Sequence, residues 1–252
     1  YWEIELENSQ VPMTDMLRMQ KQEANNAFGK FVKKNYVDWI QHPEIRPLMS
    51  PDLFKKKVFP MLDNGDKVFF ILIDNFRLDQ WREVKDLLAE YYTFDESLYY
   101  SILPTAPPSS ATQYARNSIF SGLMPLQIEK MFPELWVDED SEEGKNLNEA
   151  PLIQTQIERF RKKYTLSYHK VHDSQYNDKL LNIVPSLLHN QLNVVVLNFV
   201  DMLSHARTEN KMIRELAQSE AAYRSLTRSW FQHSGTLELF KRIAGKGYKV
   251  IV

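Results

Sequence analysis

Two carboxylates and one imidazole in this sequence have the spacing of a metal site. Asp74 follows the apolar run at residues 68–73, and Asp201 follows a second apolar run at residues 193–200. A carboxylate at the end of a buried strand is partly removed from water and needs either a cation or hydrogen-bond donors. His205 comes four residues after Asp201, so a helical segment would place both side chains on one side. Oxygen and nitrogen ligands at this spacing suit zinc, with helix capping or a structural hydrogen bond as the alternative for Asp74.

A hydroxyl group that could attack phosphorus stands in a third segment. Thr112 begins a predicted helix after the short strand expected at residues 99–103. The Thr112 hydroxyl suits two roles, a helix N-cap or a nucleophile placed against a phosphate, and the pattern leaves both open. The helix N-terminus and Arg116 would both favour the negative charge of a phosphate group. Two aspartates and a hydroxyl together indicate metal-assisted phosphoryl transfer, in which the metal lowers the pKa of the attacking hydroxyl.

Parallel strands would bring these segments together. The runs at residues 68–73 and 193–200 are continuously apolar, as in strands that are buried on both faces. Further strands are expected at residues 99–103, 166–171 and 249–252, and helices at residues 78–92, 112–121, 152–163, 181–190 and 208–244. This alternation predicts an α/β fold with a mostly parallel sheet flanked by helices. Since ligands of such sheets bind beyond the carboxyl ends of the strands, we expect Asp74 and Asp201 at the same edge.

A long helix is predicted at residues 13–40, before the α/β part of the chain. Apolar side chains recur along it at gaps of three and four residues, which places them on one helix face. They are Ala24, Phe28, Phe31, Val32, Tyr36 and Trp39. We interpret this face as packing against neighbouring helices. Prolines between residues 43 and 51 then interrupt the chain, so we divide it into a helical bundle segment at residues 1–55 and an α/β domain at residues 56–252.

The overall composition excludes several classes of protein. Lys and Arg number 31 against 33 Asp and Glu, and the formal net charge of −2 does not favour stable DNA binding. The chain has no cysteine, so disulfides and thiolate metal sites are excluded. No run approaches the roughly 18 apolar residues of a membrane helix, and Tyr1 opens no signal-peptide pattern. We therefore expect a cytoplasmic protein without a membrane partner.

Three segments resemble the sequence motifs of the PglZ domain. Residues 73–81 resemble its opening motif, residues 112–123 its nucleophile segment and residues 198–207 its metal segment. They are most similar to the PorX response regulators, which act with type IX secretion, and the similarity runs over essentially the whole chain. The resemblance implies an alkaline-phosphatase-like fold and zinc-dependent hydrolysis of nucleotide or oligonucleotide phosphodiesters. It also implies a two-component response regulator in which a receiver domain precedes a helical bundle and the PglZ domain.

The resemblance further implies roles for individual residues. Asp74 would bind one metal ion, and Thr112 would be the nucleophile and a further metal ligand. Asp201 and His205 would ligate the other metal position. The cofactor would be Zn2+, and we expect the protein to form a homodimer.

Three other residues are candidates for binding the substrate. They are Arg77, Arg116 and Asn117. A guanidinium group pairs well with a phosphate group, which supports the two arginines. For Arg77, a surface ion pair with Asp79 is the alternative.

This sequence departs from the family pattern at two places. Residues 107–111 are additional just before Thr112, which makes Thr105 a rival candidate for the nucleophile. The family continues from a strand like that at residues 249–252 into an Asp-His-Gly ligand motif, so we expect residues 1–252 alone to form an incomplete and inactive site. The alternative to an enzyme is a non-enzymatic signalling output module that serves dimerisation and partner docking.

Overall fold

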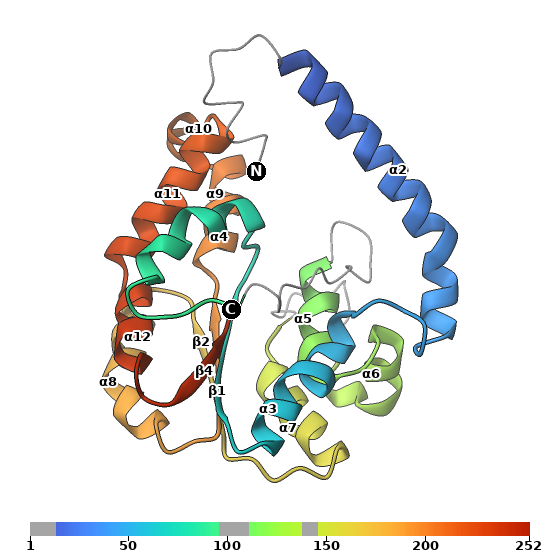
Figure 1. The fold of residues 1–252 in the computed structure, drawn as a ribbon, viewed down its shortest axis with the longest axis vertical. Helices are drawn as coiled ribbons and strands as arrows, with labels where there is room; N and C mark the ends of the chain where they lie inside the picture. Colours follow the sequence, from blue (N-terminus) through green and yellow to red (C-terminus); the bar gives the residue numbers. More distant parts are fainter. Residues whose placement is uncertain (1–13, 96–110, 138–145) are drawn as a thin grey trace. The chain divides into compact units, whose positions relative to one another are not determined.

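The chain folds into two units, Tyr1–Leu48 and Met49–Val252. The computed structural model describes residues 14–95, 111–137 and 146–252. Figure 1 shows the path of the chain through these parts. The candidate site residues that the structure describes all belong to the second unit.

The first unit contains α2 (Thr14–Gln41), an uninterrupted helix of 28 residues, which confirms the helix expected at residues 13–40. The rings of Phe28, Phe31 and Trp39 follow one another along this helix, with centroids 6.4 and 5.5 Å apart. Phe28 and Phe31 remain more than half exposed. The described residues of this unit contain no second helix against which the aromatic face could pack.

The second unit is built around a parallel sheet. Its strands are β1 (Lys67–Ile73), β2 (Leu166–Val171), β3 (Leu192–Leu197) and β4 (Tyr248–Ile251). They lie in the order β2-β3-β1-β4, and every neighbouring pair is parallel. For the described residues, the prediction of an α/β fold with a mostly parallel sheet is therefore confirmed.

Helices flank the sheet on both sides (Figure 1). One side carries α3 (Phe59–Asp63), α5 (Ala111–Ser121), α6 (Pro125–Met131) and α7 (Glu149–Arg159). The other carries α4 (Leu78–Val84), α8 (Ser174–Leu187), α11 (Glu220–His233) and α12 (Gly235–Ile243), while α9 (Phe199–Glu209) and α10 (Lys211–Leu216) extend beyond the carboxyl end of β3. Short 3₁₀ helices complete the unit, η1 (Ser50–Asp52), η3 (Lys85–Leu88) and η5 (Pro133–Leu135), together with a π-helical turn, η2 (Phe54–Val58). None of the helices described has the length and apolar character that crossing a membrane requires.

The side chains of β1 are buried on both faces of the sheet. The Phe69 ring lies 4.8 Å from the ring of Tyr248, in the core that α8, α11 and α12 cover. The Phe70 ring lies 4.8 Å from Phe54 and 6.4 Å from Phe120, on the side of α5. Because successive strand residues point to opposite faces, burial of both faces explains the continuous apolar run.

The apolar run at residues 193–200 spans a strand and the start of a helix, which corrects the prediction of one strand. The strand β3 ends early, and α9 begins at Phe199. Phe199 stacks on Trp230 at 4.5 Å and Val200 is buried, so both apolar side chains serve helix packing. Asp201 consequently lies in the first turn of α9, where a negative charge interacts favourably with the helix dipole.

Capping residues divide the helical stretch predicted at residues 208–244 into shorter helices. The side chains of Asn210, Ser219 and Ser234 accept hydrogen bonds from backbone N–H groups at the starts of α10, α11 and α12. In the same way α8 begins before residue 181, because the Asp173 side chain caps it. Polar capping of the free N–H groups favours a helix start at each of these positions.

Candidate functional site

Asp74 and Asp201 lie at the same edge of the sheet. The strands β1 and β3 are parallel neighbours, and the Asp74 backbone N–H donates to the carbonyl of Leu197 at 2.9 Å. Burial raises the pKa of the Asp74 carboxyl; the charge of Arg116 counteracts this, and the negative charge of Asp201 raises the pKa further. The two carboxylates are thus close enough to repel one another, and the expected shared edge is confirmed.

A tight turn follows Asp74 at the carboxyl end of β1. Asn75 has a φ of 57°, in the left-handed region that asparagine adopts more readily than most residues other than glycine. This turn ends the strand and lets the chain enter α4 at Leu78 after a short connection. Asp74 therefore lies between the last residue of β1 and this turn, and it is only 6% exposed.

Asp201 and His205 lie on one side of α9. His205 Nε2 is 3.7 Å from Asp201 Oδ2, as the spacing of four residues predicts for a helix. The His205 side chain is 67% exposed, and its Nδ1 lies 3.9 Å from Glu209 Oε1. An oxygen and a nitrogen donor therefore face solvent together, one helical turn apart.

The guanidinium of Arg116 is bound to two protein carboxylates. Its Nη1 donates to Asp74 Oδ2 at 2.6 Å, and its Nε and Nη2 donate to the two oxygens of Glu149 at 2.6 and 2.7 Å. Arg116 is 4% exposed and Glu149 is fully buried. In this structure Arg116 therefore orients Asp74, and its predicted contact with substrate stays a prediction.

Glu149 is a residue of this site that sequence reasoning missed. It begins α7, where an acidic residue suggests only a favourable interaction with the helix dipole. Its carboxylate also accepts a hydrogen bond from the Tyr168 hydroxyl, and Lys170 Nζ lies 3.5 Å away. One feature of the sequence could have indicated a buried acidic partner. Tyr168 and Lys170 on β2 are two residues apart, so both side chains face the same side of the sheet.

Asn198 connects the ends of three strands. Its Oδ1 accepts from Arg116 Nη1 at 3.3 Å, and its Nδ2 lies 3.3 Å from His172 Nδ1. His172 directly follows β2, Asn198 follows β3, and Asp74 follows β1. The polar groups beyond the carboxyl ends of these strands therefore form one connected network around Arg116.

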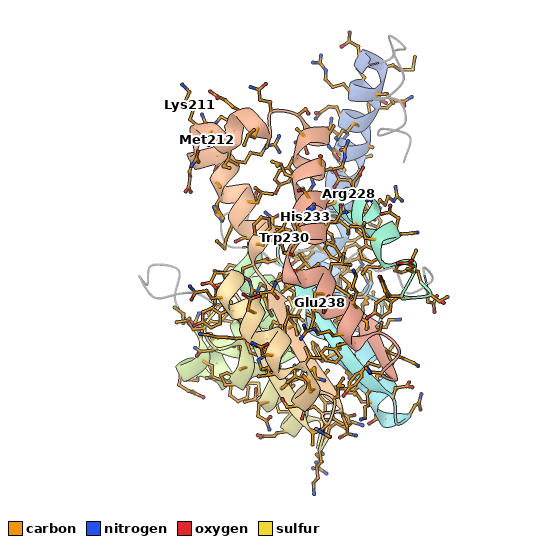
Figure 2. All side chains as sticks on the ribbon, turned by 90° about the vertical axis from the view of Figure 1, so that its left-hand side faces the viewer. Lys211, Met212, Arg228, Trp230, His233 and Glu238 are labelled. Atoms are coloured by element: carbon orange, nitrogen blue, oxygen red, sulfur yellow. The ribbon has the colours of Figure 1, made fainter. Side chains whose placement is uncertain are left out.

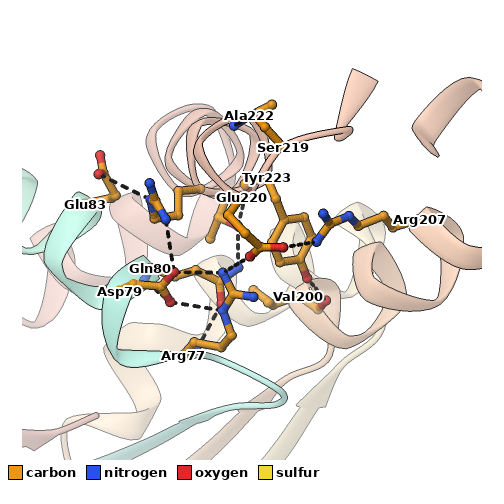
Figure 3. A network of polar contacts seen from close by, with 12 residues as sticks. Arg77, Asp79, Gln80, Glu83, Val200, Arg207, Ser219, Glu220, Ala222 and Tyr223 are labelled. Carbon is orange, nitrogen blue, oxygen red and sulfur yellow. Dashed lines mark hydrogen bonds and ion pairs between the residues drawn. The ribbon is translucent and has the colours of Figure 1, made fainter. Parts of the chain in front are cut away.

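Arg77 takes part in a surface network beside α11 (Figure 3). Its Nη2 lies 2.7 Å from Asp79 Oδ2 and 2.7 Å from Glu220 Oε2, and its guanidinium lies over the ring of Tyr223 at 5.2 Å. The ion pair that was the alternative for Arg77 is thus present. Asn117 is buried in α5, 2% exposed. Substrate contacts for Arg77 and Asn117 stay predictions.

Thr112 lies in the first turn of α5, as predicted. It precedes Arg116 by four residues, which is about 6 Å along a helix axis. The backbone of Thr112 is therefore roughly one turn away from the residue that orients Asp74. Thr105 and the strand predicted at residues 99–103 lie outside the described residues.

Comparison with known families decides the relationship that this geometry suggests. The BREX system PglZ alkaline phosphatase-like domain matches residues 53–252. The chain belongs to this PglZ family. The match confirms the resemblance drawn from the three motifs and agrees with the parallel sheet flanked by helices.

A second family matches the N-terminal segment. The PorX response regulator linker domain matches residues 1–40, directly before the PglZ region. Together the two matches describe a hydrolase-like effector region with the arrangement of a PorX-like protein. A search of curated proteins returned no match to this chain.

The oxygen and nitrogen donors of the PglZ site agree in chemical type with a zinc ion. Asp74, Asp201 and His205 supply oxygen and nitrogen, and a cation would relieve the repulsion between the two carboxylates. No described residue donates a hydrogen bond to the Asp74 oxygen that Arg116 leaves open. The described residues contain no group of three or more His, Asp or Glu side chains that could hold a metal. Among the described residues, the donors therefore match zinc in chemical type and do not form a three-ligand site.

Proposed function

We propose that this chain is the effector region of a PorX-like two-component response regulator, and that its PglZ domain hydrolyses nucleotide-type phosphodiesters with zinc. The observation that carries the proposal is the shared edge of Asp74 and Asp201, with His205 beside Asp201. Two carboxylates that repel one another at a strand edge favour a bound cation. The family match supports hydrolysis as the reaction class.

In this proposal each residue has a distinct task. Asp74 would hold one zinc ion, and Asp201 and His205 would hold the other. Thr112 would be a further ligand and supplies the attacking hydroxyl at the start of α5. When bound, zinc lowers the pKa of the attacking hydroxyl and offsets negative charge on the phosphate oxygens. The Thr112 oxygen forms a bond to phosphorus while the bond from phosphorus to one ester oxygen breaks, and the ester oxygen leaves as an alcohol that takes up the hydroxyl proton. Water then hydrolyses the bond between Thr112 and phosphorus, which restores the hydroxyl and releases the phosphate monoester. Arg116 keeps Asp74 in place through the hydrogen bond to Oδ2.

The proposal includes the partners that a PorX-like arrangement requires. A receiver domain would precede the linker segment and regulate the PglZ domain, and the protein would act as a cytoplasmic homodimer connected with type IX secretion. The support for this part is the match of residues 1–40 to the PorX linker domain.

Elemental analysis and a hydrolysis assay on the full-length protein test the proposal. Asp201→Asn is expected to lower the zinc content and to abolish hydrolysis of a dinucleotide phosphodiester. Asp178→Asn is the matched control, because Asp178 is an exposed carboxylate on α8 outside the site. Full zinc content and full turnover in Asp201→Asn would refute the proposal.

A non-enzymatic signalling module is the second candidate, and one observation favours it. Arg116 already places a cation against Asp74, so the carboxylate has a charged partner without any metal. If the protein neither retains zinc nor hydrolyses phosphodiesters but still dimerises, this second function is the better description.

A further inference from the structure

The residues that directly follow β2, β3 and β1 lie in one row across the sheet. The last residues of the three strands are in register, and the next residues are His172, Asn198 and Asp74. The Asn198 N–H donates to the carbonyl of Val171 at 3.2 Å, which continues the pairing of β2 with β3. Neighbouring strands are about 4.8 Å apart, so the backbone of His172 is roughly 10 Å from that of Asp74. A ligand that binds beside Asp74 can therefore extend along this edge toward His172.

Arg116 determines the orientation of the Asn198 side-chain amide. A guanidinium group only donates hydrogen bonds, so the amide atom 3.3 Å from Arg116 Nη1 is the oxygen Oδ1. The amide nitrogen Nδ2 consequently faces His172 Nδ1, at 3.3 Å. Because an amide nitrogen also only donates, His172 Nδ1 accepts this hydrogen bond and is unprotonated. The proton of the neutral imidazole is then on Nε2.

The Nε2–H group of His172 is available to a ligand. His172 is exposed, and its Nε2 forms no hydrogen bond to any other residue that the structure describes. The next residue, Asp173, caps α8 by accepting from the Tyr176 N–H at 2.9 Å. The Tyr176 ring lies edge-on to the His172 ring, with centroids 6.1 Å apart. His172 is therefore held between the end of β2 and a capped helix, with a free donor at the edge of the sheet that carries Asp74.

The surroundings of His172 favour its neutral form. Partial burial lowers the pKa of His172, and the positive charges of Lys170 and Arg116 lower it further. The negative charges of Asp173 and Glu149 oppose this shift. The imidazole is therefore mainly neutral at neutral pH, because the pKa of an unperturbed histidine is already about 6.5. A neutral ring with its proton on Nε2 donates a hydrogen bond there and has no free electron pair for a metal ion.

We propose that His172 is a substrate-binding residue, which donates a hydrogen bond from Nε2 to an oxygen of the substrate phosphate group and does not ligate zinc. The inference rests on the proposed phosphodiesterase function and adds a residue from the end of β2 to its site. Hydrogen bonds to a charged phosphate oxygen are stronger than those between neutral groups. Arg116, whose guanidinium binds Asp74 and Glu149, then acts on the substrate through Asn198 and His172.

Nitrogen NMR of the histidine rings tests the direction of the hydrogen bonds without zinc or turnover. In the full-length protein with a chelator at neutral pH, His172 should carry its proton on Nε2 and leave Nδ1 unprotonated. Asn198→Asp replaces the amide donor by an acceptor and should raise the pKa of His172. His189, which is exposed between α8 and β3, is the control and should titrate unchanged. A protonated Nδ1 in the wild type at neutral pH, or an unchanged pKa in Asn198→Asp, overturns the proposal.

Inorganic phosphate and a dinucleotide phosphodiester test the contact with substrate. Phosphate added to the full-length protein with zinc should shift the Nε2–H signal of His172 and leave that of His189 in place. His172→Ala should raise KM for the diester about tenfold, the loss expected for a hydrogen bond to a charged group. Its kcat and zinc content should stay unchanged, because the same contact is made before and during the reaction. His172→Gln, whose amide can donate in place of Nε2–H, should lose less, and His189→Ala is the matched control.

The outcomes separate this residue from the catalytic proposal. Loss of zinc from His172→Ala would make His172 a metal ligand and overturn the inference. Absence of the phosphate-induced shift also overturns it, as does an unchanged KM in His172→Ala when the wild type hydrolyses the diester. A phosphate-induced shift at His172, in a protein that hydrolyses no diester, would support the binding residue and overturn only the phosphodiesterase function.

Discussion

Arg116 Nη1 lies 2.6 Å from Asp74 Oδ2, and both residues are almost completely buried. The opposite side of the same guanidinium is occupied by both oxygens of Glu149. A charge in such a place needs partners, because desolvation of an unpaired ion is far more unfavourable than loss of a surface pair. The position of Asp74 therefore depends on a residue of α7 that lies outside the candidate metal ligands.

Replacement of Glu149 should reveal this dependence. Glu149→Gln keeps the shape of the side chain but leaves Arg116 with one buried charge partner. We expect the free energy of unfolding to fall by about 3 kcal/mol or more, the range for a broken buried ion pair. Urea unfolding of the variant measures this change.

A surface ion pair provides the matched control. Glu238, labelled in Figure 2, accepts from Arg242 Nε at 2.8 Å, one turn apart on α12. Both side chains are more than 40% exposed. Glu238→Gln is expected to change the free energy of unfolding by at most about 0.5 kcal/mol. Equal effects of Glu149→Gln and Glu238→Gln would show that the Glu149 pair does not depend on its burial.

The sheet and its edge could be predicted because their signals are local. Continuous apolar runs at β1 and β3 identify strands that are buried on both faces, and parallel pairing brings the carboxyl ends together. Asp74 and Asp201 follow from this argument alone. The spacing of Asp201 and His205 likewise determines their separation once the segment is helical.

The partners of Arg116 could not be predicted, because they come from distant parts of the chain. Glu149 is 33 residues away in sequence, and Asp74 is 42 residues away. The phosphate-binding role was predicted for Arg116 only from its position near a helix N-terminus. The predicted boundary between β3 and α9 was wrong because it also depends on a contact distant in sequence. Phe199 stacks on Trp230 and Val200 is buried, so these two apolar residues pack α9 and do not extend the strand.

The glycine that ends α5 should resist substitution. Gly122 has a φ of 65°, and a Cβ atom there would lie 2.1 Å from Gln156 Nε2 on α7. Gly122→Ala therefore combines an unfavourable backbone conformation with a clash between the two helices that carry Arg116 and Glu149. We expect thermal unfolding to show a destabilisation above the roughly 1–2 kcal/mol of the backbone term alone.

Substitution of Gly65 measures the effect of the backbone conformation without that of a clash. Its φ is 88°, but a Cβ atom there would meet no other atom within 4 Å. Gly65→Ala should therefore show the backbone term without a clash. If Gly122→Ala is no more destabilising than Gly65→Ala, the close approach of Gln156 to Gly122 is wrong.

Acid should weaken the contacts between α4 and α11. Burial raises the pKa of Asp79 and Glu220, but hydrogen bonds from Arg77 to both carboxyls, and from Arg207 to Glu220, outweigh it, so both pKa values lie below their ordinary range. Such carboxylates stabilise the fold above their unfolded-state pKa of about 4, and this stability is lost as pH falls through the folded-state values. The free energy of unfolding should therefore decrease below about pH 4.

Removal of Arg77, whose positive charge contacts both Asp79 and Glu220, tests the source of this pH dependence. Arg77→Gln should flatten the acid decrease in urea unfolding curves recorded at several pH values, because both carboxyl pKa values then move toward their ordinary range. Lys211→Ala, which removes an exposed charge outside this network, should leave the decrease unchanged. An unaltered acid decrease in Arg77→Gln would contradict the assignment to Asp79 and Glu220.

Thr112 can be tested as a nucleophile separately from any role as a helix cap. Thr112→Ala should destabilise the fold by at most about 1 kcal/mol, the loss for a helix-capping hydroxyl, because Thr112 lies within the first turn of α5. Loss of a nucleophile should instead lower turnover by orders of magnitude while melting changes little. Melting temperature and turnover of a nucleotide diester by the full-length protein distinguish these effects, and Thr112→Ser should restore part of the activity.

Thr105→Ala belongs in the same experiment, because the resemblance to the PglZ motifs leaves Thr105 as the rival candidate for the nucleophile. If Thr105→Ala abolishes turnover and Thr112→Ala does not, the assignment of the nucleophile to α5 is wrong. If both variants keep full turnover and full zinc content, neither hydroxyl forms a covalent bond to phosphorus. Water would then be the attacking group, and the role of the α5 N-terminus would be limited to binding the phosphate.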